Sequence, residues 1–100
     1  MWGVNMYTSI IEIQIQSGKM DEALEITEAM KPDLAQLDGL RQFIVIDKGN
    51  DAILVLAIYD SQAQQEAAGP KAQELLGRMG ALCTAAPERK SGDVKVNEHY

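Results

Sequence analysis

A tyrosine ends the most apolar segment of the chain, and its hydroxyl is the first group to consider for chemistry. Tyr59 is the last residue of "AILVLAIY", residues 52–59, and the polar stretch "DSQA" follows it. A tyrosine ring packs against apolar groups while its hydroxyl forms a hydrogen bond to a ligand or to a backbone carbonyl. Tyr59 is therefore the best candidate for a catalytic or ligand-binding residue, with Tyr7 as a second phenol. The alternative is that Tyr59 is only a wall residue of the core.

Four other side chains have chemistry to offer, and each has a simpler explanation. Arg41 is a candidate to bind an acidic ligand, although an ion pair at the surface or between subunits explains it more simply. Glu12 would act as a base only if burial raised its pKa, and a hydrogen-bonded carboxylate at an interface is the simpler interpretation. His99 and Cys83 are the only residues of their types. His99 has no evident partner, and Cys83 suits a small buried side chain, so the sequence predicts no metal site and no cofactor.

The composition excludes several classes of function. A chain of 100 residues with 46% hydrophobic content is long enough for one globular domain, and we expect residues 1–100 to form it, with residues 1–5 as a disordered tail. The net charge of −6 argues against a nucleic-acid partner, which requires a basic surface. No apolar run approaches the length of a membrane span, and no signal peptide is evident. A single cysteine suits a reducing compartment, and we expect a cytoplasmic protein.

Hydrophobic periodicity predicts four strands and two helices. Apolar residues alternate with polar ones in 7–16 and 93–99, whereas 40–46 and 52–59 are more continuously apolar. A helix is expected from Met20, with Pro32 ending or kinking it. Ser61 begins a capping-box pattern that Gln64 completes, so a second helix is expected there. Gly69 and Pro70 are expected to divide this second helix into two pieces.

The order strand, helix, strand, strand, helix, strand predicts a ferredoxin-like α+β fold. Its four-stranded antiparallel sheet has both helices on one face, so the other face is open. We expect Leu54, Leu56 and Ile58 on one strand, with Leu40, Ile44 and Ile46 on its neighbour, to contribute to that open face. An exposed apolar face of this size indicates a partner surface, and a second copy of the chain is the simplest partner.

Three short motifs resemble the antibiotic-biosynthesis-monooxygenase-like (ABM-like) domains. They are "LDGLRQF" at 37–43, "YDSQA" at 59–63 and "GDVKV" at 92–96. The family often has Pro-Gly-Phe where this chain has Asp38-Gly39-Leu40, and Trp-Glu-Ser where it has Tyr59-Asp60-Ser61. The resemblance covers residues 6–98. It implies a dimeric α+β barrel, with a pocket between the sheet and the helices of each subunit.

The resemblance also implies where a ligand would bind. Tyr59 shares a face with Ile53, Val55 and Ala57, and the family places this face toward the helices. Four residues are the candidate ligand-binding set: Tyr59, Tyr7, Ile11 and Arg41. Haem-degrading members carry an Asn, a Trp and a haem-ligating His at positions that correspond here to Ile11, Tyr59 and the Gly69-Pro70 region. Because all three are absent, haem degradation is not expected.

Two functions of different classes remain open at this point. The first is a non-catalytic homodimer that binds a small apolar or aromatic ligand. The second is a cofactor-independent monooxygenase or isomerase, which would orient a small quinol-like or aromatic substrate in an apolar pocket with Tyr59 as hydrogen-bond donor. Because no complete catalytic constellation is evident, the sequence favours the first. A regulatory amino-acid-binding domain of the same topology is a further alternative.

Overall fold

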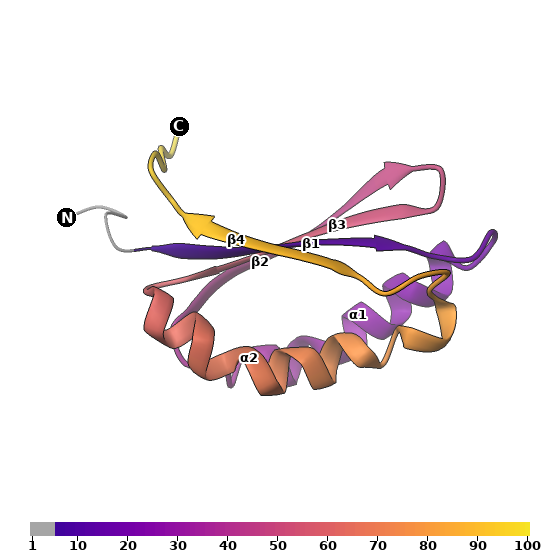
Figure 1. Cartoon of the computed structure of the whole chain (residues 1–100), viewed down its shortest axis with the longest axis horizontal. Coiled ribbons are helices and arrows are strands. Elements are labelled where there is room, and N and C mark those ends of the chain that lie inside the picture. Colours follow the sequence, from indigo (N-terminus) through magenta and orange to yellow (C-terminus); the bar gives the residue numbers. More distant parts are fainter. Residues whose placement is uncertain (1–5) are drawn as a thin grey trace.

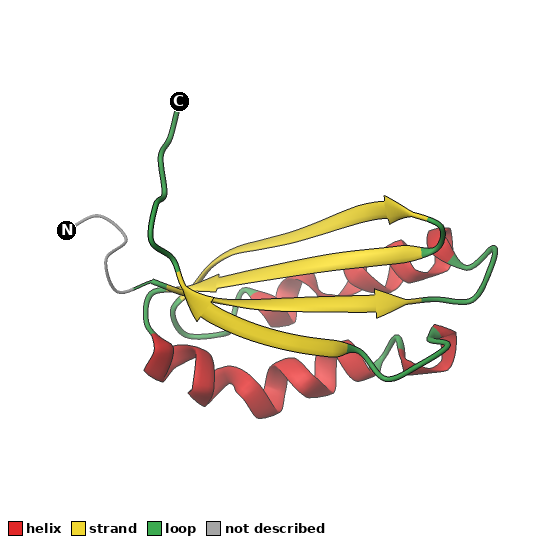
Figure 2. Ribbon diagram, turned by 45° about the horizontal axis from the view of Figure 1, so that its top comes forward, coloured by secondary structure: helices red, strands yellow, loops and turns green. Residues whose placement is uncertain are grey.

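The fold is a four-stranded antiparallel sheet with two helices on one face (Figures 1 and 2). We analysed a computed structural model, which describes residues 6–100. The predicted tail, residues 1–5, lies outside the described residues. The strand order is β2-β3-β1-β4, and the element order is the predicted ferredoxin-like one. The elements are β1 (Tyr7–Gln14), α1 (Met20–Leu34), β2 (Leu40–Gly49), β3 (Ala52–Tyr59), α2 (Gln62–Gly77), a 3-10 helix (Gly80–Leu82) and β4 (Glu88–Asp93).

The two central strands provide the sheet side of the core, as their alternation predicts. Ile11 and Ile13 of β1, and Ile53 and Val55 of β3, are each at most 3% exposed and face the helices. The helices cover them with a second set of buried apolar side chains: Ala23, Met30 and Leu34 from α1, and Ala68, Leu75 and Leu76 from α2. Burying a large aliphatic side chain contributes about 1.5–3 kcal/mol, so this layer is the main stabilising contact between the sheet and the helices.

The last strand is not where the sequence predicts it. The strand predicted at 93–99 is wrong: β4 is Glu88–Asp93, and residues 94–100 form no strand. β4 pairs antiparallel with β1, Tyr7 opposite Asp93 through Glu12 opposite Glu88. It is an edge strand whose side chains are mostly exposed, and edge strands commonly carry charged residues that discourage further pairing. The apolar alternation that guided the prediction is therefore missing from the residues that pair.

Both helices continue through a proline. α1 passes Pro32 and ends at Leu34. The predicted division of α2 is wrong, because α2 is one helix that contains Pro70 and bends along its length (Figure 1). Proline removes one backbone hydrogen bond, and its ring clashes with the Cβ of the preceding residue in a helix. The preceding residue here is Gly69, which has no Cβ. No helix in the described part of the chain is long and apolar enough to cross a membrane.

Gly69 and Pro70 are expected to be energetically coupled. Pro70→Ala restores a backbone donor in the middle of α2, and we expect it to raise the free energy of unfolding by about 1–3 kcal/mol. Gly69→Ala should stabilise by about 1 kcal/mol only in the Pro70→Ala background, because in the natural chain its new methyl group meets the proline ring. Urea denaturation of the four proteins of this cycle measures the coupling. Additive effects would contradict this explanation.

The face of the sheet opposite the helices carries a continuous group of aliphatic side chains. Ile10, Leu56 and Ile44 are direct neighbours across β1, β3 and β2. The open face, as we call it, is made by six residues: Ile10, Ile44, Ile46, Leu54, Leu56 and Ile58. Leu40 was predicted to belong to it and does not, because a β-bulge between Leu40 and Gln42 pairs Leu40 with Tyr59 on the helix side. The rest of the predicted open face is confirmed.

Candidate functional site

A small cavity lies between the sheet and the two helices, close to Tyr59. Its volume is about 50 Å³. Its apolar wall comes from both layers: Ile11, Phe43 and Ala57 from the sheet, Leu37 from the connection that follows α1, and Met30, Leu34, Gly69, Ala72, Leu75 and Leu76 from the helices. Four lining residues carry polar groups, namely Ser9, Tyr59, Gln65 and Arg89. The cavity is thus an apolar space with a few polar groups, as small-molecule sites usually are.

Within the described part of the chain, Tyr59 lines this cavity with a buried ring and an unpaired hydroxyl. The residue is 2% exposed, and its hydroxyl has no hydrogen-bond partner among the described residues. No enclosed side-chain oxygen or nitrogen in that part of the chain lacks a partner, so the Tyr59 hydroxyl borders accessible space. Burial raises the pKa of Tyr59 above its ordinary value, because the phenolate is poorly solvated there. Tyr59 is therefore neutral at physiological pH and can donate a hydrogen bond to a group in the cavity.

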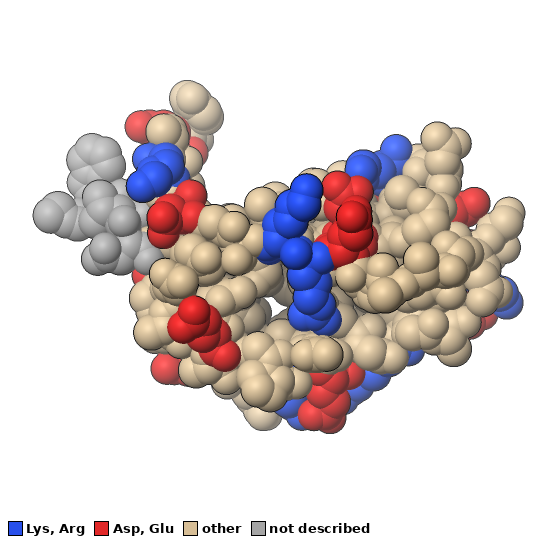
Figure 3. Space-filling model, in the orientation of Figure 1, with Lys and Arg blue, Asp and Glu red and all other residues tan. Residues whose placement is uncertain are grey.

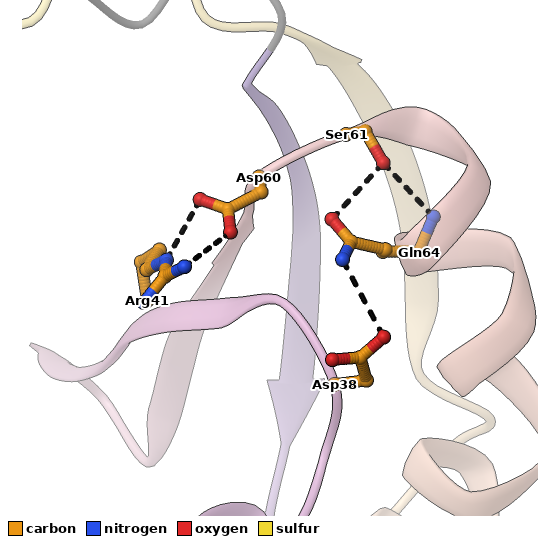
Figure 4. Close-up of polar contacts among 5 residues, drawn as sticks. All are labelled: Asp38, Arg41, Asp60, Ser61 and Gln64. Carbon is orange, nitrogen blue, oxygen red and sulfur yellow. Dashed lines mark hydrogen bonds and ion pairs between the residues drawn. The ribbon is translucent and has the colours of Figure 1, made fainter.

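The junction that positions Tyr59 is held by a small polar network (Figure 4). Ser61 is the N-cap of α2, and its Oγ accepts a hydrogen bond from the backbone N–H of Gln64 at 3.2 Å. The Ser61 hydroxyl also donates to Oε1 of Gln64 at 3.1 Å. Nε2 of Gln64 lies 3.5 Å from Oδ2 of Asp38, in the connection before β2. The predicted cap is confirmed, but the Gln64 side chain bonds to the serine hydroxyl and not to its backbone N–H.

Gly39 lies against the same network, and a side chain at this position would displace the Gln64 side chain. Its φ of +81° is in the left-handed region, and a Cβ built on it would lie 2.5 Å from Cδ of Gln64. The Gly39 carbonyl accepts a hydrogen bond from the Asp60 backbone N–H at 2.8 Å. The connection before β2 therefore packs directly on the end of β3, which fixes the backbone beside Tyr59.

Arg41 takes part in an ion pair and does not line the cavity. Its Nε donates to Oδ1 of Asp60 at 2.7 Å, and Nη2 donates to Oδ2 of the same carboxylate (Figure 4). The guanidinium lowers the pKa of Asp60 mainly through this hydrogen bond, and Asp60 in turn raises the pKa of Arg41. Arg41 lines a separate, open groove of about 550 Å³ between α1 and β2. The simpler interpretation, a surface ion pair, thus describes Arg41 within this chain.

The cavity brings together two of the four predicted ligand-binding residues. Ile11 and Tyr59 line it, whereas Arg41 and Tyr7 do not. The Tyr7 hydroxyl lies 3.1 Å from Oγ of Ser91 at the surface. Sequence reasoning missed Arg89, because the last strand was predicted at 93–99, beyond this residue. With β4 correctly placed, alternation would have found it, since Arg89 is the register partner of Ile11.

A hydrogen-bonded pair of polar residues, Ser9 and Gln65, also lines the cavity, and sequence reasoning missed it. Nε2 of Gln65 donates to Oγ of Ser9 at 2.9 Å, linking α2 to β1. Ser9 lies opposite Ser91 in the register of β1 and β4. Its parity with Ile11 was available in the sequence, but a serine in a strand gives no signal of its own.

The remaining candidates have structural roles. Glu12 forms an exposed ion pair with Lys48 at 3.1 Å, so the proposal of a buried base has no support in its surroundings. Cys83 is half-buried, its thiol donates to the Met79 carbonyl, and burial raises its pKa. His99 is exposed beyond β4. Within residues 6–100, no group of three or more His, Cys, Asp or Glu side chains is arranged to hold a metal ion.

The sequence of the chain matches one family model. The family model described as antibiotic biosynthesis monooxygenase matches residues 6–69, which is more than half of the chain. The chain therefore belongs to the antibiotic biosynthesis monooxygenase family, and the predicted resemblance is confirmed. A search of the curated proteins found no match.

Solved structures of very different sequence share the fold. A protein of unknown function from Nitrosomonas europaea is 11% identical with a TM-score of 0.81, covering 98% of this chain and 97% of its own. A conserved protein from Methanosarcina mazei is 9% identical with a TM-score of 0.79, covering 93% and 96%. A variant of SnoaB, a cofactor-independent oxygenase from Streptomyces nogalater, is 11% identical with a TM-score of 0.76, covering 93% and 96%. At these identities the likeness establishes the fold alone.

Proposed function

We propose that the protein is a homodimer that binds a small aromatic ligand in the cavity between its sheet and helices. The observation that carries the proposal is Tyr59, a residue only 2% exposed that lines the cavity and whose hydroxyl has no hydrogen-bond partner among the described residues. The hydroxyl is thus free to form a hydrogen bond with a molecule in the cavity. A bound phenol or carbonyl compound would accept this hydrogen bond, while its ring would contact the apolar wall.

Binding requires the cavity to widen. A volume of about 50 Å³ holds water molecules, whereas a cavity that binds benzene measures about 150 Å³. The wall offers a way to widen, because Met30 is an unbranched, adaptable side chain. Gly69 and Ala72 on α2 also take up little space on the same wall. Ligand entry would therefore shift side chains without moving the sheet.

The proposed dimer forms through the open face. Six aliphatic side chains, all at least partly exposed, gather on one side of the sheet, and a contiguous apolar patch is a mark of a partner surface. A stable interface buries about 800 Å² per partner, which is the scale of one face of a small sheet. Light scattering over a wide concentration range tests this, and we expect a mass twice the 11.0 kDa of the chain.

Binding without catalysis fits the cavity better than catalysis does. Its residues with ionisable side chains are Tyr59 and Arg89, and the raised pKa of Tyr59 keeps its phenol neutral at neutral pH. Within the described chain, no carboxylate, histidine or cysteine side chain lines it, so a general base for abstracting a substrate proton is not in place.

Oxygenation without a cofactor is the second candidate. It is favoured by membership of the antibiotic biosynthesis monooxygenase family and by the similar fold of SnoaB, which is a cofactor-independent oxygenase. Oxygen uptake with small quinols, measured above their spontaneous oxidation and lost in Tyr59→Phe, would support this second function over simple binding.

Tyr59→Phe is expected to weaken phenol binding and to leave toluene binding unchanged. Losing one neutral hydrogen bond of about 0.5–1.5 kcal/mol corresponds to a roughly 3- to 10-fold weaker affinity. Chemical shifts of cavity methyl groups, followed during titration with each compound, measure the two affinities. Equal loss for both compounds, or none for phenol, would contradict the role given to the hydroxyl.

The alkaline limb of stability provides a control for Tyr59→Phe. Folding raises the pKa of Tyr59, so the neutral form is favoured in the folded state. Neutral Tyr59 therefore contributes fully to the free energy of unfolding of the natural protein below the ordinary tyrosine pKa of about 10. This contribution is lost as the pH rises through the raised pKa of the folded state. The Phe variant should lose less stability over that interval and should match the natural protein at pH 7.

A further inference from the structure

Two of the basic residues have no carboxylate partner, and they are neighbours on β4. Seven of the nine Lys and Arg side chains lie within 4.0 Å of a carboxylate in the described residues. Arg89 and Lys90 do not, and residues 1–5 contain no Asp or Glu that could pair with them. In a chain with fifteen acidic residues and a net charge of −6, an unpaired arginine is an unusual feature to find beside a cavity.

The register places the two basic side chains on opposite faces of the sheet. Arg89 is opposite Ile11, on the helix side, and it lines the cavity. Lys90 is opposite Ile10, on the side of the open face. Figure 3 shows basic side chains over the middle of the molecule, next to a hollow between the sheet and the helices. Arg89 is exposed, so its guanidinium lies where the cavity meets solvent.

We propose that the ligand carries an anionic group, a carboxylate or an acidic phenol, that Arg89 binds at the mouth of the cavity. This inference rests on the proposed function and adds to it the chemical class of the ligand. A guanidinium binds a planar anion through two parallel hydrogen bonds. The apolar wall then receives the uncharged part of the molecule, which it could not do for the anion itself.

Arg89 and Tyr59 lie at separate positions along the cavity. On β1, the register partner of Tyr59 is Tyr7 and that of Arg89 is Ile11. Four residues of strand separate these positions, or roughly 13 Å along the backbone. Both side chains line the cavity, so a ligand that spans the cavity can contact both. An anion at one end and a hydrogen-bonding group at the opposite end are the expected features.

Titration with 4-hydroxybenzoate and 4-hydroxybenzamide tests the proposal. The two probes share shape and hydroxyl, but only the first is charged at neutral pH. We expect the natural protein to bind the benzoate at least ten-fold more tightly, with a preference that falls as salt is added. Arg89→Gln should bind both probes equally, at the affinity of the amide. Lys90→Gln removes the same charge from the adjacent residue on the other face and should keep the preference.

The outcomes separate this proposal from the proposed function. If both probes bind the natural protein equally, or if Arg89→Gln keeps the preference for the benzoate, the anionic class is wrong and the cavity remains a neutral site. If neither probe shifts the cavity methyl groups at millimolar concentration, the ligand-binding function itself is wrong, and this inference fails with it. Arg89 lies on an exposed edge strand, so circular dichroism should show both variants folded.

Discussion

Replacing Leu56 by glutamate is expected to convert the proposed dimer into a monomer. Leu56 lies at the centre of the open face, between Ile10 and Ile44 on the two neighbouring strands. In a sheet-to-sheet dimer, the new carboxylate would be buried against aliphatic side chains of the second copy. Burying an unpaired charge costs several kcal/mol, so we expect dimer dissociation to become more favourable by roughly a thousand-fold.

The control for Leu56→Glu distinguishes the effect of a charge on the open face from the effect of an added charge elsewhere. Gln73→Glu adds the same negative charge at an exposed site on α2, away from the open face. We expect light scattering to give a single chain mass for Leu56→Glu and twice that mass for Gln73→Glu. A natural protein that is monomeric at every concentration would refute the dimer directly. A Leu56→Glu variant that remains dimeric would show that the interface lies on another surface.

Replacing Met30 by alanine is expected to destabilise the fold and to open the ligand cavity. Met30 is 0% exposed and lines the cavity wall. Truncating a buried methionine to alanine costs about 2–5 kcal/mol, from lost contacts and from the space left behind. That space adjoins the existing cavity of about 50 Å³. A larger apolar cavity can accept a small aromatic molecule, so the variant should recover part of its lost stability when phenol is added.

Met79→Ala is the matched control for this effect. Met79 is also core, at 2% exposed, but it does not line the cavity. Both variants should have lower melting temperatures than the natural protein. Only Met30→Ala should show a melting temperature that rises with phenol concentration in excess of the natural protein's response. An equal ligand response in the two variants would mean that the cavity near Tyr59 has no special capacity to bind.

The elements that could be predicted are those in which burial requires a regular pattern of apolar residues in the sequence. β3 has the predicted bounds, 52–59, because it is central in the sheet. The helix-facing side of Tyr59 followed from the same alternation, together with the family resemblance. β4 could not be found in this way, since a mostly exposed edge strand need not alternate. Because β4 provides Arg89, this error also left Arg89 out of the predicted site.

Local signals failed where tertiary contacts or neighbouring residues overrode them. Pro70 is a strong signal for a helix end, yet α2 continues through it, and Gly69 before it reduces the steric conflict because it has no Cβ. Leu40 was assigned to the wrong face because a single bulge shifted the parity of β2. The size of the cavity also lay beyond prediction, because it depends on how side chains of all four strands and both helices pack together.

Because Gly39 and Gln64 are in contact, we expect these two positions to co-vary in related sequences. A side chain at position 39 would have to displace the Gln64 amide, and with it the bonds to Ser61 and Asp38. Substitutions at positions 39 and 64 should therefore be correlated, with a smaller residue at 64 whenever the residue at 39 has a Cβ. The positive φ of Gly39 adds a preference for asparagine or aspartate at 39 over branched residues.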